Sequence, residues 1–222
     1  MIVPTAPAPP DVTYAIGVTG SMNPAIHHLL WYKVIGAIDD EEYQAAIRFP
    51  FNTTTQLLSQ LRFGTPLLVI QCQQNEWSIQ GHGDESWSRM VRVASLVFEK
   101  LNETPVNGFS MTSQKHLATS ITDVKSALAE KIHGTGLGFP AGDNRGSSIE
   151  LTVGIEDYQL KTALQPSVKG PDKLFTYYQH IYPVPQDAAT YFDLGKLIAS
   201  RVNLFCEAQK NHCDNAVLAI GR

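Results

Sequence analysis

The sequence predicts an α+β fold of two layers, in which an antiparallel sheet carries helices packed on one face. Apolar and polar residues alternate in several short segments, as they do in strands with one covered and one solvated face. Two longer segments, residues 84–101 and 187–211, instead place apolar residues at helical spacing. Each of these follows a run of strands, so the sequence also predicts two similar halves.

The strands are predicted from period-two alternation and from the turns between them. The first covers residues 12–19, where Tyr14, Ile16 and Val18 share one side. The segment 149–155 alternates in the same way, and its apolar residues are expected to point inward. The other predicted strands are residues 67–72 and 76–79, joined at Gln74–Asn75, a strand beginning at Val106, and residues 158–162 and 173–182.

The helices are predicted from capping residues and from terminating Gly and Pro residues. Asn23 and Pro24 are typical of a helix start, and the acidic run 39–42 suits a solvated turn or a first helical turn. The predicted helices are one from Asn23–Pro24 closed by Gly36, residues 53–63 ended by Gly64, a helix capped by Asp84 and stopped by Thr104–Pro105, and residues 122–132 and 187–211.

The domain organisation is predicted to be simple. Residues 1–11 form a Pro-rich tail, and residues 12–222 form one α+β domain. Its halves, about 12–133 and 147–213, are joined by the Gly-rich segment 134–146. There is no alternating strand–helix–strand series, which argues against a doubly wound dinucleotide-binding sheet.

The Gly-rich segment does not fit a phosphate-binding loop. Its glycine spacing, Gly134-x-Gly136-x-Gly138, differs from Gly-x-Gly-x-x-Gly, and a helix precedes it where one should follow. Gly134 suits the position after a helix C-terminus. We interpret the segment as a connector, and the alternative is a ligand-binding loop that includes Arg145.

The composition narrows the function classes. The net charge of −4 argues against non-specific electrostatic binding of nucleic acid. No apolar run reaches the roughly 18 residues of a membrane span, and the first residues lack the pattern of a signal peptide. The three cysteines form no paired framework and suit reduced thiols, so we expect a cytoplasmic protein.

Catalytic and metal-binding patterns are weak. His82, Asp84 and Glu85 lie together, and acid–base or metal chemistry there is conceivable. A structural role explains the two acids without any acid–base or metal chemistry. Asp84 would cap the helix, and Glu85 would be favoured by the helix dipole. His212 and Cys213 lack the ligand spacing of a zinc site. We therefore predict no catalytic residue, no metal and no cofactor.

The aromatic segment 173–182 is the strongest binding candidate. It carries Phe175, Tyr177, Tyr178 and Tyr182, with rings on both faces of the strand. Such rings are enriched at protein interfaces and also stack on nucleic-acid bases. Without a basic groove, a protein surface is favoured over a nucleic-acid surface. Simple packing between the sheet and the helices is an equally weighted alternative.

One local pattern resembles a known group of proteins. The pattern is Trp77-x-Ile79, then a helix with Ala94-Ser-Leu-Val-Phe98-Glu-x-Leu101, then Thr104-Pro-Val106. It is similar to uncharacterised, sporadically distributed bacterial proteins built of paired strand-then-long-helix units, often in mobile-element or defence gene neighbourhoods. The resemblance covers mainly residues 67–110, and residues 173–213 show a looser similarity. It implies an accessory subunit without catalytic residues.

Together these patterns predict a non-enzymatic interaction module that works as a subunit or adaptor of a larger cytosolic assembly, through protein partners or self-association. Two alternatives stay open. One is a hydrolase or nuclease with a site assembled from scattered residues near His82, Asp84 and Glu85. The other is single-stranded nucleic-acid binding through residues 173–182.

Overall fold

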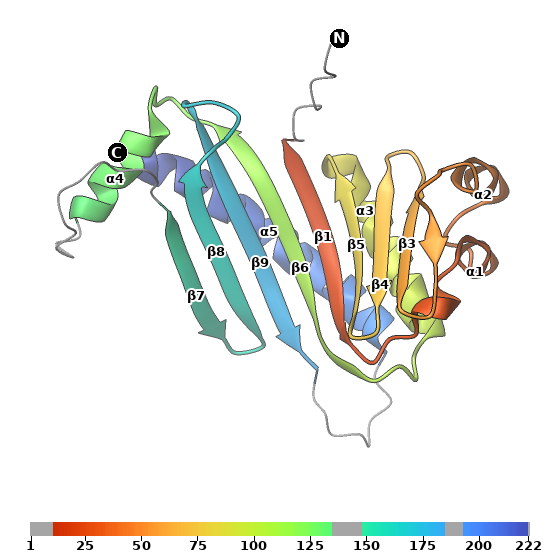
Figure 1. The fold of residues 1–222 in the computed structure, drawn as a ribbon. Coiled ribbons are helices and arrows are strands. Elements are labelled where there is room, and N and C mark those ends of the chain that lie inside the picture. Colours follow the sequence, from red (N-terminus) through yellow and green to blue (C-terminus); the bar gives the residue numbers. More distant parts are fainter. Residues whose placement is uncertain (1–10, 135–147, 185–192, 222) are drawn as a thin grey trace, which may run out of the picture.

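The structure is a computed structural model that describes residues 11–134, 148–184 and 193–221. It contains one antiparallel sheet of nine strands (Figure 1). The strands are β1 (Val12–Gly20), β2 (Thr53–Thr54), β3 (Leu58–Phe63), β4 (Leu68–Gln73), β5 (Glu76–His82), β6 (Val106–Ala118), β7 (Ile149–Ile155), β8 (Tyr158–Pro166) and β9 (Lys173–Pro183). The α+β class is thereby confirmed.

The helices of the described ranges are two long ones and several short ones. They are the 3₁₀ turn η1 (Pro24–Ile26), α1 (Leu29–Val34), α2 (Asp40–Ala46), α3 (Asp84–Lys100), α4 (Val124–Gly134) and α5 (Leu194–Gly221). Asn23 accepts a hydrogen bond from the amide of Ala25 at the start of η1, and Asp39 and Glu42 form a capping box on α2. Both caps lie where the sequence predicts helix starts. The single helix predicted from Asn23–Pro24 to Gly36 is, however, divided into η1 and α1, and His28 caps the second.

The strand order reveals two units arranged alike. The sheet runs β2-β3-β4-β5-β1-β6-β9-β8-β7. In each unit a long strand (β1 or β6) leads through helical structure to a three-stranded meander and then to a long helix (α3 or α5). The last meander strand, β5 or β9, pairs back with its own first strand. By this criterion the units divide between α3 and β6, whereas we expected the division at residues 134–146.

The buried side of the sheet is continuous across the two units. Ile79, Ile16, Met111 and His180 are direct neighbours on β5, β1, β6 and β9, and all four are fully buried. The helix α3 contacts β1 and β5, and α5 contacts β6 and β9, both behind the sheet in Figure 1. The two helices therefore cover one face of one core.

The core joins α3, α5 and the sheet through aromatic rings. Phe205 of α5 lies 5.1 Å from Trp87 of α3 and 5.9 Å from Tyr178 of β9, measured between ring centroids. A second cluster, at the far end of α5, contains Leu174 and Leu128. Contacts of this kind contribute about 0.5–1.5 kcal/mol beyond the burial of area, so the interface between the helices stabilises both units.

Segment 53–63 was predicted wrongly as a helix. It contains β2 and β3, and on β3 the buried residues are Ser59, Leu61 and Phe63. This period of two is that of a strand, and pairing with β4 outweighs the helical spacing we inferred. Gly64 does end the element, with a φ of +84°.

Three smaller expectations also need correction. The N-cap of α3 is Gly83 and no side chain caps it, so Asp84 is the first residue of the helix. The helix α5 continues to Gly221, beyond the predicted end at 211, and residues 185–192 lie outside the described ranges. The apolar residues of β7 point to the helix side but are exposed, and the main sheet contacts of α5 are with β6 and β9.

Gly195 permits the closest approach of α5 to α3. A Cβ atom at this position would lie 2.5 Å from the carbonyl oxygen of Ser95 and 3.2 Å from the amide of Glu99. We expect Gly195→Val to lower the free energy of unfolding by about 1–3 kcal/mol, since the helices must separate. Urea denaturation measures this change. Ala199→Val, on the exposed side of α5, is the matched control, and equal losses in both variants would contradict the explanation.

Candidate binding surface

The face of the sheet opposite α3 and α5, called here the open face, carries no helix from the described ranges (Figure 1). One row of neighbours on it consists of four small or polar residues and one apolar residue, Ile181. The row is Ser78, Gly17, Ser110, Ile181 and Gln159, on β5, β1, β6, β9 and β8. Each is intermediate or exposed in its burial. The side chains at the centre of the open face therefore project little from the sheet, and solvent reaches them.

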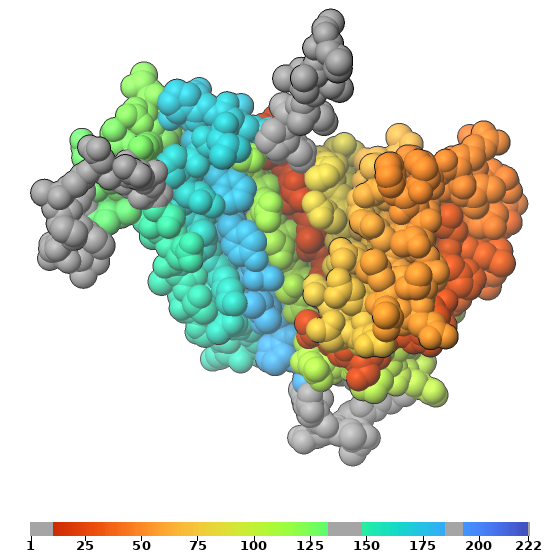
Figure 2. Space-filling view, viewed as in Figure 1, coloured from red at the N-terminus to blue at the C-terminus, as the bar shows by residue number. Residues whose placement is uncertain are grey.

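A trough lies along this row, with a volume of about 670 Å³. In the space-filling view, β1 and β6 are recessed between the blue-green and yellow strands (Figure 2). This volume is in the range of small-ligand and peptide sites. The residues that line the trough are Gly17, Thr19, Glu76, Asn107, Gly108, Phe109, Ser110, Ile155, Glu156, Asp157, Tyr158, Gln159, Gln179, Ile181, Tyr182 and Pro183.

The floor of the trough depends on two small residues. A Cβ atom on Gly17 would lie 3.2 Å from the hydroxyl of Ser110 and 3.9 Å from a carboxylate oxygen of Glu76. Larger side chains at Gly17 or Ser110 would project from the centre of the sheet and fill the hollow. The small residues at the β1–β6 junction therefore create the trough.

The rim of the trough is acidic. Glu76 lies at the start of β5, and Glu156 and Asp157 form the turn between β7 and β8. Asp157 forms an ion pair with Arg201 at 3.3 Å, whereas Glu76 and Glu156 have no ion pair within the described residues. Apolar contact on the open face is available from Ile181. This combination favours a ligand with basic and apolar groups.

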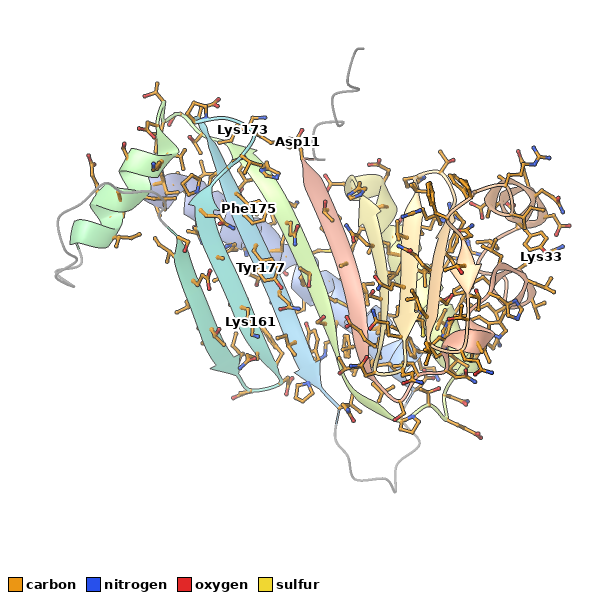
Figure 3. All side chains as sticks on the ribbon, viewed as in Figure 1. Asp11, Lys33, Lys161, Lys173, Phe175 and Tyr177 are labelled. Carbon is orange, nitrogen blue, oxygen red and sulfur yellow. The ribbon has the colours of Figure 1, made fainter. Side chains whose placement is uncertain are left out.

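Two of the predicted binding residues, Phe175 and Tyr177, lie on the open face (Figure 3). The ring of Phe175 is 5.1 Å from that of His116, and the hydroxyl of Tyr177 donates to Gln179 at 2.8 Å. Lys161 lies on the neighbouring strand β8, and Lys173 is the first residue of β9 itself. Rings and lysines on an open sheet face are the elements of a base-stacking platform.

The charge near these rings is partly neutralised. Lys169 and Lys173 approach Asp11 at 2.7 and 3.9 Å, and the contact with Lys169 lowers the pKa of the Asp11 carboxyl. Lys161 forms no ion pair with any residue that the structure describes. Among the described residues, Lys161 is thus a lysine without a carboxylate partner on the open face near Tyr177.

The other two predicted rings, Tyr178 and Tyr182, are buried on the helix side of β9. Their hydroxyls bond the two ring nitrogens of His180, at 2.8 Å to Nε2 and 2.9 Å to Nδ1. The ring of Tyr158 stacks over His180 at 4.1 Å. Packing between sheet and helices, one of the alternatives above, thus describes these two tyrosines, whereas Phe175 and Tyr177 lie on the open face.

Burial controls the ionisation of this cluster. It lowers the pKa of His180 to about 4 and raises the pKa of Tyr178 to about 12. It also raises the pKa of Tyr182, which Arg201 only partly offsets. The imidazole is therefore neutral at pH 7, with one nitrogen donating and the other accepting.

The predicted cluster of His82, Asp84 and Glu85 does not converge. A ring nitrogen of His82 bonds the Thr13 hydroxyl at 3.0 Å, on the open face. Asp84 accepts a hydrogen bond of 2.6 Å from Tyr14, on the helix side, and lies 3.8 Å from Lys115. Because Thr13 and Tyr14 are consecutive in a strand, these contacts point to opposite faces.

Within the part of the chain that the structure describes, no three His, Cys, Asp or Glu residues gather as metal ligands, and no helix is long and apolar enough to cross a membrane. Arg145, the remaining predicted binding residue, lies outside the described ranges, as does most of the Gly-rich segment. In the comparisons with known proteins, no family model, no curated protein and no solved structure matches this chain.

Sequence reasoning missed the trough. The available signal was the polar side of the first strand, where Ala15 and Gly17 are small and flanked by Thr13 and Thr19. Small residues on a solvated face indicate a close approach or a hollow. The partner strand that completes the floor, β6, is distant in sequence, so its contribution was not visible.

The cluster around His180 predicts a pH dependence of stability. Its pKa is about 4 in the fold, below the ordinary 6.5, so the unfolded chain binds more protons between these values. Stability is therefore lost as pH falls through this window, and the lowered pKa values of His27 and His212 act in the same direction. Urea denaturation at pH 7.5 and 5.0 should show a smaller difference for His180→Gln than for the wild type.

His180→Gln should also be less stable at both pH values, since Tyr178 and Tyr182 lose a partner. The exposed His82 supplies the control variant His82→Gln, which should keep the wild-type difference. An unchanged pH difference in His180→Gln would show that this histidine is not responsible.

Proposed function

We propose that this chain is a non-enzymatic protein-interaction module, and that the trough holds an extended segment of a protein partner. The observation that carries the proposal is the hollow of about 670 Å³ at the centre of the open face, floored by Gly17 and Ser110. A segment lying across the strands there contacts polar groups from five strands without disturbing the helix-covered core.

The rim defines the chemistry of that segment. Glu76 and Glu156 favour lysine or arginine on the partner, and Ile181 favours an apolar residue beside them. Electrostatic complementarity of this kind acts mainly on specificity and association rate. We propose an extended basic–apolar peptide as the ligand class.

The biological setting stays a prediction. The resemblance at residues 67–110 supports an accessory subunit of a mobile-element or defence assembly, and the cysteine usage supports the cytoplasm. The hydrolase or nuclease alternative has no support from His82 and Asp84, whose contacts point to opposite faces.

Single-stranded nucleic acid is the second candidate ligand, because Phe175 and Tyr177 share the open face with Lys161. Stacking on such rings contributes about 1–3 kcal/mol per base. The net charge of −4 and the pairing of Lys169 and Lys173 with Asp11 make this the weaker proposal.

The peptide proposal predicts that filling the trough abolishes docking. Linear peptides selected from a random phage library on the wild-type protein should be enriched in basic and apolar residues. Measured by fluorescence anisotropy, Ser110→Arg should weaken their binding at least about tenfold, because the guanidinium occupies the floor of the trough. A tenfold loss of affinity corresponds to about 1.4 kcal/mol of binding free energy.

Gln71→Arg is the matched control, since Gln71 is exposed on β4 in line with the same row but outside the trough. It adds the same charge and should leave the affinity within about twofold. Failure to select any peptide, or equal binding by Ser110→Arg, would reject the trough as the docking site.

The nucleic-acid proposal predicts salt-dependent binding of a fluorescein-labelled oligo(dT). Tyr177→Ala and Lys161→Ala should each reduce the affinity about five- to tenfold at low salt, through lost stacking and lost charge. Lys33→Ala, at the distant α1, is the control for charge alone (Figure 3). No anisotropy change at 50 mM salt would eliminate this ligand class.

A further inference from the structure

The two edges of the sheet differ sharply. One edge is β2, which has only 2 residues. The other is β7, with 7 residues in unbroken antiparallel register with β8. Within the described ranges, β8 is the only strand paired with β7, so one side of β7 has backbone groups without a strand partner. Figure 1 shows β7 at the outer end of the sheet.

The strand β7 also exposes a row of apolar side chains. Ile149, Leu151, Val153 and Ile155 are 39%, 55%, 37% and 40% exposed, and all lie on the helix side. They continue the buried row of the sheet, since Val153 pairs with Leu160, which pairs with His180. The main sheet contacts of α5 are with β6 and β9, and these four side chains remain exposed.

Within the described residues, the strand β7 itself carries few of the usual protections of an edge strand. Natural edges carry lysine, proline or a bulge, or are very short. The sequence of β7 is Ile-Glu-Leu-Thr-Val-Gly-Ile, with Glu150 as its single charge, and its register with β8 has no shift. An open edge of this kind favours pairing with another strand.

We propose that the edge is an interface with a second copy of this chain, in which two β7 strands pair antiparallel about a two-fold axis at Thr152. This inference does not depend on the trough or its ligand. In this register Ile149 faces Ile155 of the second copy, and Leu151 faces Val153. The apolar row of one copy thus continues into that of the other.

Charge complementarity favours a second copy as the occupant. In the same register, Glu150 faces Gly154, which has no side chain, so neither carboxylate meets a like charge. The two Glu150 residues lie about 14 Å apart, four residues along the strands at about 3.4 Å each. Thr152 faces its own copy, and Thr–Thr pairs are favourable across strands. The strand is therefore complementary to itself.

The interface is small, so the dimer should be weak. One strand pair with its apolar row buries less than the roughly 1,200 Å² of a standard interface. We expect a dissociation constant of about 10 µM, equivalent to about −7 kcal/mol.

Sedimentation velocity on the full chain from about 1 to 200 µM tests the proposal around that dissociation constant. The wild type should shift from monomer to dimer. Leu151→Lys should stay monomeric, because its exposed position tolerates lysine in the monomer while the dimer places the charge against Val153. Val168→Lys, at a residue 87% exposed in the turn between β8 and β9, should dimerise normally.

Cross-linking tests the register. With Cys206→Ser removing the partly exposed native thiol, Thr152→Cys should cross-link to itself through a short bismaleimide. Gly154→Cys should not, since the two positions 154 are about 14 Å apart across the axis.

A wild type that is monomeric at about 200 µM, twentyfold above the expected constant, would overturn the proposal. So would a dimer that Leu151→Lys leaves intact, or one in which Gly154→Cys cross-links and Thr152→Cys does not. Selected peptides that still bind monomeric Leu151→Lys would show that the trough functions separately.

Discussion

The antiparallel pairing of β1 with β6 is the contact on which the rest of the structure depends. It joins residues 12–20 of the first unit to residues 106–118 of the second, and it places Ile16 beside Met111 and Gly17 beside Ser110. Because successive side chains point to opposite faces, the same pairing builds the buried row on one side and the trough floor on the other. A one-residue shift in register would exchange the two rows, so the fold and the candidate site are specified together.

The uneven helix coverage follows from the same arrangement. The helices α3 and α5 pack against each other over the central strands, where Gly195 permits their close approach. The apolar row of the outermost strand, β7, remains exposed. His180 is the last fully buried side chain in the row that leads to β7. It is enclosed by Tyr178, Tyr182 and Tyr158, whereas Val153 of β7, in the same row, is exposed.

Patterns within one segment were predictable from the sequence, and contacts between distant segments were not. Alternation and capping identified the first strand, the 67–79 pair, the strands after residue 148 and the start of the Asp39 helix. The helix predicted at 53–63 failed because pairing with β4 decides its conformation, and the partner is not part of the local pattern. The face assignment of Tyr177 and Tyr178 likewise needed the position of α5, since both faces of β9 carry rings. The trough could not be predicted because its floor also includes Ser110. This residue pairs with Gly17 but belongs to the other unit.

The trough and the β7 edge are connected through one short turn. Ile155 and Glu156 line the trough, and Ile155 is also the last residue of β7. In the two-fold pairing proposed for β7, this end of the strand lies beside Ile149 of the second copy. The apolar row on the helix side would then continue into the neighbouring chain, while on the open face Glu76 and Glu156 would still face the solvent. Self-association and segment binding are therefore separable in their residues but adjacent in space, as expected for a module that presents its ligand in pairs.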